Sequence, residues 1–550
     1  MSTFTATILS GTSPLDPSYR VVSIDVRREV NRIPQAELRL RDGSAAAREF
    51  KISNDSFFEP GAEIEIRLRY EGGSEETVFK GLVVRHGVEA SLEGSHLVIG
   101  LKDAAVKLAG ARLSEVHRNE SDAKTIRKLV QRAGLKVGDI PANSAPEYVE
   151  MVQYRASAWD FIVSRADVLG RLVAVEDGVV SLPKMEVASS AAAKLEYGIN
   201  NLYEIEIEAD AGHQPGAVQS VGWNAKKGAQ TLKKAATFTT RAGNLKGDAL
   251  GKAMGSAVVT LSHPVPADEN ELQAWADSRM ARSRLALLRG RISMPGTTAI
   301  KQMDVIQLAG VSDRFNGKAL VTGVRHRVNA AGWRTDLQLG LSPEEYARRQ
   351  DIREVPAAGL LPAVSGLQIG VVAEFQEDKT DKLRVKVNLP GIDMQQSSAV
   401  WARLLAPDAG KNRGYYFRPE PNDEVVVGFL NDDPRQPVVL GALYGAVNTP
   451  SALMKTPTAD NAYRGIVTKA GTKIVFVDDK KSSVYIETAK KGKLLLDDGS
   501  KDGEETISLT DKHGNAITMG KDGIEIKSKK KVVVNGASGV EIKGKKVDIK

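Results

Sequence analysis

The C-terminal part of the chain, from about residue 466 to residue 550, alternates apolar and polar residues in short repeated units. The pattern predicts strands that begin at residues 524, 532, 540 and 547. Period-two alternation places aliphatic side chains on one face of these strands and Glu or Lys on the other. Because the apolar face needs a partner, we expect a β-solenoid or an intertwined β-prism of identical chains. The residues expected at the common axis are Ile524, Ile526, Val540 and Ile542.

Residues 1–350 show alternating strand patterns that are interrupted by helical ones. Ser121 is the expected N-cap of a first helix that stops at Gly134, and a second helix is expected over residues 157–170. A third helix is predicted at about 268–289. We therefore predict two β-barrel modules with a small α+β insertion at about 118–185. The clearest strand patterns are residues 20–26, 36–40, 63–70, 201–208, 303–308 and 319–326.

Prolines at positions 343, 356 and 362 indicate a linker between the first 350 residues and the rest of the chain, and we place this linker at 351–366. Five short strand patterns then predict an OB-fold barrel over residues 367–450. A neck is expected at 451–465 and the spike-like repeat at 466–550. The fold class is thus mainly β, with the strand patterns of the barrel at residues 369–375, 383–389, 399–404, 424–430 and 437–443.

Composition is ordinary for a soluble globular protein, with 42% hydrophobic and 26% charged residues. The N-terminus lacks the basic start and apolar stretch of a secretory signal, so we expect synthesis in the cytoplasm. The absence of cysteine excludes disulfides and thiolate metal sites. Residues 466–550 hold 18 Lys, no Arg and 13 acidic residues, which is +5 of the total charge of +7. These Lys residues alternate with acids, which favours the solvated outer face of a prism over nucleic-acid binding; contact with anionic envelope surfaces is a compatible further use.

Three segments of the chain resemble a known family. Residues 400–444, with V-W-A-R, G-Y-Y-F-R-P-E-P-N-D-E-V-V-V-G-F-L-N-D-D-P and Q-P-V-V-L-G-A-L-Y, closely resemble the OB domain of VgrG-type spike proteins and of the related central spikes of contractile phage tails. Residues 152–165 resemble a motif of that family's hub, and residues 321–335 are similar to its closing strands. The residues that carry the resemblance are Gln153, Tyr154, Asp160, Phe161, Trp401, Arg403, Pro419, Asp423, Glu424, Gly428, Phe429, Asp433, Pro434, Pro437 and Gly441.

The resemblance implies a structural homotrimeric spike and baseplate hub of a contractile injection system. Residues 1–350 would be a tail-hub-like domain that adapts a hexameric Hcp-like inner tube to three-fold symmetry and contacts baseplate proteins. A PAAR-type tip protein is expected at the C-terminal end, and contact with the target membrane would be transient. The particle would be assembled in the bacterial cytoplasm. The N-D-D-P-R-Q-P segment of the barrel and the compact hub favour a particle that is released from the cell. The expected tip-binding residues are Val547, Ile549 and Lys550.

Catalytic, cofactor and metal sites are not expected, because G-x-S-x-G, H-E-x-x-H and C-x-x-C motifs do not occur. Only about 20 residues separate the barrel from the repeat, too few for the lysozyme domain of T-even phage spikes, and we expect no effector domain after the repeat. Acid pairs at 478–479, 497–498 and 504–505 are expected at solvated strand ends. A trimeric tail-spike glycan hydrolase or a β-helical adhesin is the alternative.

Two further groups of residues are interpreted as structural. The seven histidines show no metal-ligand spacing and are expected at turns or on the surface. Trp401, Arg403, Pro419, Asp423 and Glu424 could line an oligosaccharide-binding surface, since OB barrels often bind such ligands. Barrel packing and subunit contacts are the favoured interpretation of these five residues.

Overall fold

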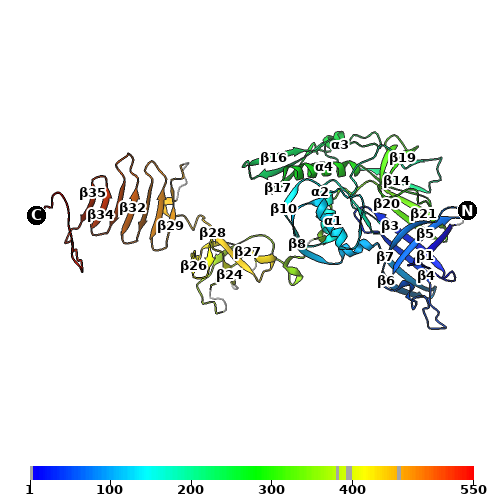
Figure 1. Cartoon of the computed structure of the whole chain (residues 1–550), viewed down its shortest axis with the longest axis horizontal. Coiled ribbons are helices and arrows are strands. Elements are labelled where there is room, and N and C mark those ends of the chain that lie inside the picture. Colours follow the sequence, from blue (N-terminus) through cyan, green and yellow to red (C-terminus); the bar gives the residue numbers. More distant parts are fainter. Residues whose placement is uncertain (1–3, 353, 380–382, 392–398, 455–459, 550) are drawn as a thin grey trace. The chain divides into compact units, whose positions relative to one another are not determined.

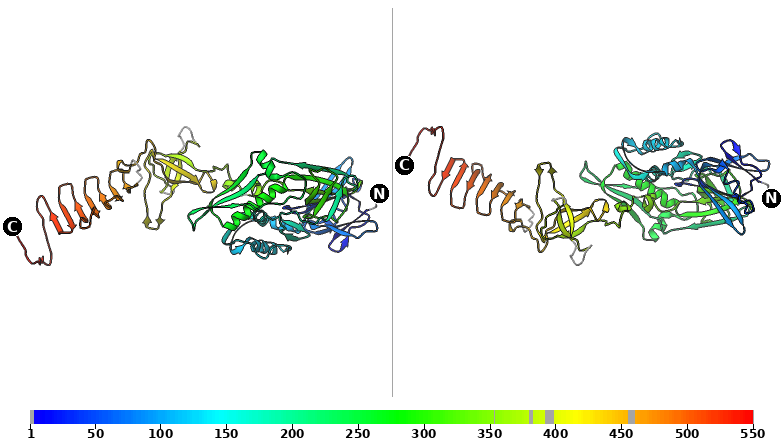
Figure 2. Two further views of the ribbon diagram at one scale, coloured as in Figure 1. Left: turned by 90° about the horizontal axis from the view of Figure 1, so that it is seen from above. Right: turned by 90° about the horizontal axis from the view of Figure 1, so that it is seen from below.

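The computed structural model describes residues 4–352, 354–379, 383–391, 399–454 and 460–549 (Figure 1). The chain forms two compact units, Met1–Glu354 and Val355–Lys550, which Figure 2 shows from two further sides. The division falls inside the segment 351–366 that the sequence predicts as a linker. Residue 353 of this linker and residues 455–459 of the predicted neck lie outside the described residues.

The first β module, residues 4–102, follows the alternation of its sequence. In its fifth strand Ile64, Ile66 and Leu68 are buried, whereas the Glu and Arg residues between them are not, because successive side chains point to opposite faces. The buried residues join Phe58 and Phe79 in one continuous core. The elements are β1 (Phe4–Ser10), β2 (Ser13–Pro14), β3 (Val21–Glu29), β4 (Gln35–Arg41), η1 (Ser56–Phe58), β5 (Glu63–Tyr70), β6 (Glu76–Ser91), β7 (Gly94–Lys102) and η2 (Ala104–Ala109).

A second β module has a core of its own, which includes Ile292, Ile306 and Leu337. Antiparallel pairing of β20 with β3 joins the two modules in one 13-stranded sheet. The predicted pair of β modules is confirmed, and the structure adds that they share a sheet. The strands are β13 (Ala193–Glu196), β14 (Glu204–Ala209), β18 (Leu288–Pro295), β19 (Val305–Ala309), β20 (Gly317–Asn329) and β21 (Gly332–Leu339).

The insertion between the modules contains the first two predicted helices. The helix α1 (Asp122–Arg132) begins after Ser121, and α2 (Ala158–Val168) begins after Ser157; each serine oxygen accepts a hydrogen bond from a backbone N–H of the first turn. Gly134 follows α1 with a φ of +73°, a conformation that glycine adopts without strain. Both predicted helices are therefore confirmed. The strands around them are β8 (Arg112–Ser121), β9 (Lys136–Val137), β10 (Glu147–Ser157), β11 (Ala174–Glu176) and β12 (Val179–Ser181).

Residues 217–285 form a layer that the sequence pattern predicts only in part. The expected third helix is present as α4 (Glu269–Leu285), and its Ala276 and Met280 pack against Val218. The three-stranded sheet β16-β15-β17 beside it was not predicted. Among the described residues, none of the helices combines the length and apolarity needed to cross a bilayer. The additional elements are β15 (Ala217–Asn224), β16 (Ala229–Lys234), α3 (Gly247–Ala253) and β17 (Val258–Pro266).

The second unit begins with the predicted five-stranded barrel, which is closed in the order β22-β23-β24-β28-β27. Its inner face buries mainly valines, among them Val387, Val425 and Val427. The OB-type barrel predicted from five alternating segments is confirmed. Its strands are β22 (Gln368–Val372), β23 (Val385–Asn388), β24 (Val400–Leu404), β27 (Glu424–Phe429) and β28 (Pro437–Ala442), with the short pair β25 (Ala409–Gly410) and β26 (Arg413–Gly414).

The C-terminal part of this unit is a seven-stranded sheet in which each strand pairs antiparallel with the next along the chain. Its first strand begins at Tyr463, three residues before the predicted boundary at 466. The predicted strand at 524 is present as the last strand of the sheet. The strands are β29 (Tyr463–Val467), β30 (Lys473–Val477), β31 (Ser483–Glu487), β32 (Lys493–Asp497), β33 (Thr506–Thr510), β34 (Ala516–Gly520) and β35 (Gly523–Lys527).

The three strands predicted to begin at residues 532, 540 and 547 are not formed in the single chain. Residues 528–549 contain no strand, and Val532, Val540 and Ile549 are exposed. The prediction is wrong for an isolated chain because a strand is defined by hydrogen bonds to a neighbour. In this segment the Gly539 N–H donates a hydrogen bond to the Gly536 carbonyl at 3.1 Å, which closes a turn.

Candidate assembly interface

One face of the sheet β29–β35 consists of two apolar ladders that run across the strands. In each of the strands β30–β35 the two ladder residues are two positions apart and therefore point to the same side, and β29 contributes Ile466 alone. Cross-strand pairing places each of them opposite the equivalent residue of the next strand. The first ladder is Ile466, Ile474, Ile486, Leu494, Leu509, Ile517 and Ile526, and the second is Phe476, Val484, Leu496, Ile507, Met519 and Ile524.

The two ladders are open to solvent in the single chain. All of their residues except Val484 are exposed, from 36% for Leu494 to 68% for Ile524. A soluble protein that works as a monomer rarely leaves so continuous an apolar face uncovered. We name this face, made of the thirteen ladder residues, the apolar ladder face.

The opposite face of the same sheet carries polar and charged side chains together with apolar ones, among them Val475, which is buried, and Leu495, which is half-buried. Lys473 and Lys493 lie over the ring of Tyr485, 5.7 and 4.6 Å from its centroid. Glu487 forms ion pairs with Lys491 at 3.1 Å and Lys473 at 3.3 Å, and the hydrogen bond from Lys491 contributes most to lowering the pKa of Glu487. These charged groups are stable in contact with water, whereas the apolar ladder face is stabilised when another surface covers it.

The acid pairs of this region lie at strand ends, as the sequence predicts. Asp497 ends β32, and its carboxylate accepts a hydrogen bond from the Gly499 N–H at 2.9 Å. Glu504 accepts from the backbone N–H of Ser500 at 3.1 Å and from its hydroxyl at 2.9 Å. The backbone bond from Ser500 is the main reason that the pKa of Glu504 lies below its usual value. These carboxylates therefore stabilise turns.

The residues predicted at the axis and at the tip lie in two settings. Ile524 and Ile526 lie on β35, at the end of the apolar ladder face, and are 68% and 61% exposed. The other predicted residues lie beyond β35, outside any strand, and Lys550 lies outside the described residues. The exposed residues of this second group are Val540, Ile542, Val547 and Ile549.

Trp401 is the centre of the possible oligosaccharide surface on the barrel. Arg384 and Lys386 lie over its ring, 5.8 and 5.3 Å from the centroid, and so occupy a position in which a sugar would stack. Asp423 accepts a hydrogen bond from the Glu420 N–H at 2.8 Å and shapes the turn before β27. This arrangement favours the packing interpretation. The other residues of the group are Pro419 and Glu424, both half-buried, and Arg403, which is exposed.

The remaining family-motif residues of the barrel shape β27, β28 and the turn between them. Hydrogen bonds from Arg435, whose guanidinium approaches to 2.7 Å, lower the pKa of Asp433 and hold this turn. A Cβ on Gly428 would come within 3.2 Å of Leu367, so a larger residue would crowd this contact. Pro437 is buried at the start of β28. Phe429 and Pro434 are half-buried, and Gly441 is exposed.

In the first unit, the motif at residues 153–161 links β10 to α2. Gln153 is buried, and its amide donates a hydrogen bond to a backbone carbonyl at 2.8 Å across an irregularity in β10. The carboxylate of Asp160 accepts hydrogen bonds from the hydroxyls of Ser157 at 2.5 Å and Tyr346 at 2.8 Å. Tyr154 is exposed. The motif therefore ties the end of the first unit to the start of α2.

Two of the seven histidines are buried, which corrects the expectation that they lie at turns or on the surface. His117 lies on β8 beside Phe161, with 5.5 Å between ring centroids. His326 lies on β20, where its ring contacts Thr335 and Trp333. Burial lowers the pKa of His326 to about 4. Both side chains face inward from strands, and the alternation of β20 around position 326 could have indicated this.

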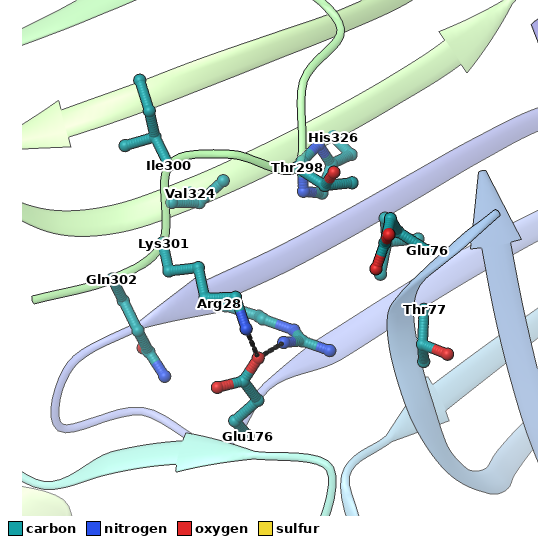
Figure 3. A pocket seen from close by; sticks show the side chains of 11 residues that line it. Arg28, Glu76, Thr77, Glu176, Thr298, Ile300, Lys301, Gln302, Val324 and His326 are labelled. Atoms are coloured by element: carbon teal, nitrogen blue, oxygen red, sulfur yellow. Dashed lines mark hydrogen bonds and ion pairs between the residues drawn. The ribbon is translucent and has the colours of Figure 1, made fainter. Parts of the chain in front are cut away.

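A cavity of about 70 Å³ lies where the two β modules meet the insertion (Figure 3). Arg28 pairs with Glu176 at 3.2 Å and with Asp177 at 2.7 Å, and Lys301 pairs with Glu176 at 2.8 Å. Positive and negative groups therefore compensate one another, which is typical of a structural junction. Among the described residues no group of three or more His, Cys, Asp or Glu residues could hold a metal ion.

Three family descriptions match parts of the chain. Residues 1–330, more than half of it, match the Alg8 N-terminal domain. Residues 368–444 match the type VI secretion system and phage-baseplate injector OB domain, and these residues contain the closed barrel. Residues 483–550 match the phage baseplate V C-terminal trimerisation domain, which includes β31–β35.

Similar proteins are type VI secretion and tail proteins. The chain is 27% identical over 252 residues to the spike protein VgrG1a of Pseudomonas aeruginosa, with 41% of this chain and 38% of that protein covered. It is 28% identical over 232 residues to VgrG1b of the same organism, with 38% and 31% covered. The chain thus spans less than two fifths of the length of these relatives. The E. coli c3393 protein, a component of the type VI secretion system, matches 80% of this chain and 100% of its own at 11% identity and a TM-score of 0.40.

Proposed function

The chain belongs to the VgrG-type spike proteins of contractile injection systems and to the Alg8 N-terminal domain family, and from this premise we propose that three copies form a central spike. The apolar ladder face is the observation that carries the proposal. Each copy covers the ladders of the other two, so that one central line receives aliphatic side chains from all three. The polar face around Tyr485 then remains in water.

Burial of the ladders supplies the free energy of assembly. Fully burying a Val, Leu, Ile, Phe or Met side chain contributes roughly 1.5–3 kcal/mol relative to leaving it exposed. The thirteen ladder residues of each chain are already partly covered, so only part of this contribution remains for assembly. This gain must offset the cost of bringing chains together, which is roughly 4–15 kcal/mol. Residues 528–549 gain strand partners in the same step, which explains why they form none alone.

The two β modules of the first unit suggest how the spike meets the rest of the machine. Three copies with two modules each present six similar modules, which suits contact with a hexameric inner tube of the Hcp-like kind. This ring would adapt six-fold to three-fold symmetry and would bind the baseplate proteins. The tube and baseplate partners are inferred from the family and from the duplication of the module.

At the other end, the spike is pushed through the target envelope when a surrounding sheath contracts. The work comes from the sheath, and this chain contributes rigidity and shape without a catalytic step. In the trimer, residues 547–549 would offer strand edges on which a PAAR-type tip protein would sit. The chain is made in the bacterial cytoplasm and becomes part of a phage tail-like particle, of which the released extracellular kind is our preferred interpretation.

The proposal is tested by the solution mass of the purified full-length chain, combined with negative-stain images. We expect a mass of about three times 59.2 kDa and a thin projection on each particle. A particle of 59.2 kDa that stays soluble and folded over a range of concentrations would overturn the proposal.

A further inference from the structure

The net positive charge of the C-terminal region, residues 466–550, lies in its last 30 residues. Residues 466–520, which include β30–β34, contain nine Lys and nine acidic residues and are therefore neutral. Residues 521–550 contain nine Lys and four acidic residues, so the whole excess of +5 lies there. A solvated outer face alone does not require such a difference, because the neutral strands are equally exposed to water.

The centre of this charge is a run of three lysines directly after β35. Lys529, Lys530 and Lys531 are exposed, and none of them takes part in an ion pair among the described residues. Further along, Lys543 pairs with Glu541 at 2.6 Å and Lys546 pairs with Asp548 at 2.8 Å. Two of the four acids of the segment, Glu541 and Asp548, therefore compensate other lysines, and no acid among the described residues is paired with the run of three.

We propose that residues 521–549 bind a membrane surface rich in anionic lipid headgroups. This inference rests on the proposed function, since three copies would bring three such segments together at one end of the spike. Lysine is a flexible point charge that suits headgroup phosphates of no fixed geometry. The attraction of several lysines adds up, and simultaneous engagement of three segments strengthens it further. The spike would thereby dwell on the envelope before it is driven through.

Lipid is favoured over nucleic acid by what the segment lacks. Residues 521–550 contain no Arg and no aromatic residue. Proteins that hold single-stranded nucleic acid stack bases on aromatic rings, and Arg is the usual residue for bidentate recognition of bases. A surface of lysines alone recognises charge density, which a leaflet of anionic headgroups offers continuously.

The experiment measures flotation of the full-length protein with vesicles of phosphatidylcholine alone or with about 30% phosphatidylglycerol, at about 0.1 M salt and at about 0.5 M salt. The test variant combines Lys529→Glu, Lys530→Glu and Lys531→Glu. The control combines Lys480→Glu, Lys490→Glu and Lys512→Glu, which makes the same change of charge in three turns of the neutral part. None of these control lysines takes part in an ion pair among the described residues. The solution mass of every protein is measured first.

We expect the wild type and the control to bind the phosphatidylglycerol vesicles, and the test variant to bind at least about 50-fold more weakly. Binding should fall sharply at the higher salt concentration. Equal loss in the control and the test variant, or equal binding to both kinds of vesicle, would overturn the inference while the spike proposal stands. A wild-type protein that binds a 30-base DNA but not the vesicles would also overturn it, in favour of nucleic acid. A wild-type mass of one chain would instead contradict the proposed function.

Discussion

The OB barrel and the C-terminal sheet use the same aliphatic residues but cover them in different ways. In the barrel, strands β22, β23, β24, β28 and β27 close on themselves, and the inward side chains, such as Val387 and Val427, are completely buried. Among the described residues of 463–549, Val475 is the one buried hydrophobic residue. A closed barrel covers its own apolar face, whereas an open sheet five residues wide cannot. The difference predicts that the barrel folds alone and that the sheet depends on other copies.

The largest effect is expected from a charge on the apolar ladder face. Leu509→Asp would place a carboxylate from each copy in the proposed interface, at a cost of several kcal/mol per buried charge, and should reduce the solution mass to that of one chain. Ser508→Asp, one residue away on the polar face, is the matched control and should leave the mass unchanged. In the single chain Leu509 is 53% exposed, so a protein that works as a monomer would tolerate Leu509→Asp. Equal masses for the two variants would remove the distinction between the two faces.

A smaller effect, on the pH dependence of the stability of the first unit, is expected from a change at His326. Its pKa is lowered to about 4 by burial, below the ordinary value of 6.5, so the folded unit favours the neutral ring. The contribution of His326 to stability is therefore fully present above pH 6.5 and is lost as the pH falls towards about 4, with a total of about 3 kcal/mol. Urea unfolding between these pH values should show a weaker pH dependence in His326→Gln. The exposed His513→Gln is the control, and an identical dependence in both variants would contradict the buried neutral ring.

Val427→Ala should destabilise the barrel by about 2 kcal/mol, because it leaves a space in a closed core. Since the barrel covers its own core, this loss should be the same at every protein concentration. Leu509→Ala on the ladder face should instead give a melting temperature that depends on concentration. Thermal unfolding at two concentrations, about 100-fold apart, separates the two behaviours. If the melting temperature depended on concentration in Val427→Ala and not in Leu509→Ala, the distinction between the barrel and the sheet would be contradicted.

The smallest effect is expected at the N-cap of α2. Ser157→Ala removes a side-chain hydrogen bond to the first turn and should cost about 1 kcal/mol, measured by denaturant unfolding of the first unit. Ser157→Thr keeps a hydroxyl that can accept from the Asp160 N–H and donate to the Asp160 carboxylate, and it should keep most of the stability. Assembly should not change in either variant, because the residue lies in the first unit. A loss of assembly would show that the two units are coupled.

The alternation of residues predicts which face of a strand is buried when apolar residues occupy only every second position. In β5, the series Ile64, Ile66 and Leu68 assigns the buried face without ambiguity, and the five barrel segments are equally clear. In β30 and β32, apolar residues occupy consecutive positions, as in Leu494, Leu495 and Leu496, so the sequence does not tell which parity forms the ladder. Only the pairing register of the sheet assigns it. For this reason the sequence alone does not identify the ladder residues before β35.

Other differences arise where a residue's partners are distant in sequence or lie outside the chain. The burial of His117 on β8 depends on Phe161 of the helix α2, and the burial of His326 on β20 depends on Trp333 of the neighbouring strand β21. The sequence does not predict the sheet β16-β15-β17, because its strands mix Ser, Thr and Lys with apolar residues. The predicted strands after residue 528 fail in one chain because no neighbour is present to bond with them.

The most direct test uses the fact that the chain has no cysteine, so that one introduced thiol reports on one position. Leu509→Cys and Ser508→Cys are labelled with a water-soluble maleimide in the full-length protein. If sister chains cover the apolar ladder face, the thiol at 509 will react at least about tenfold more slowly than the thiol at 508. In an uncovered chain the order is reversed, because Leu509 is 53% exposed and Ser508 is half-buried. A thiol at 509 that reacts as fast as the one at 508, or faster, would contradict the account.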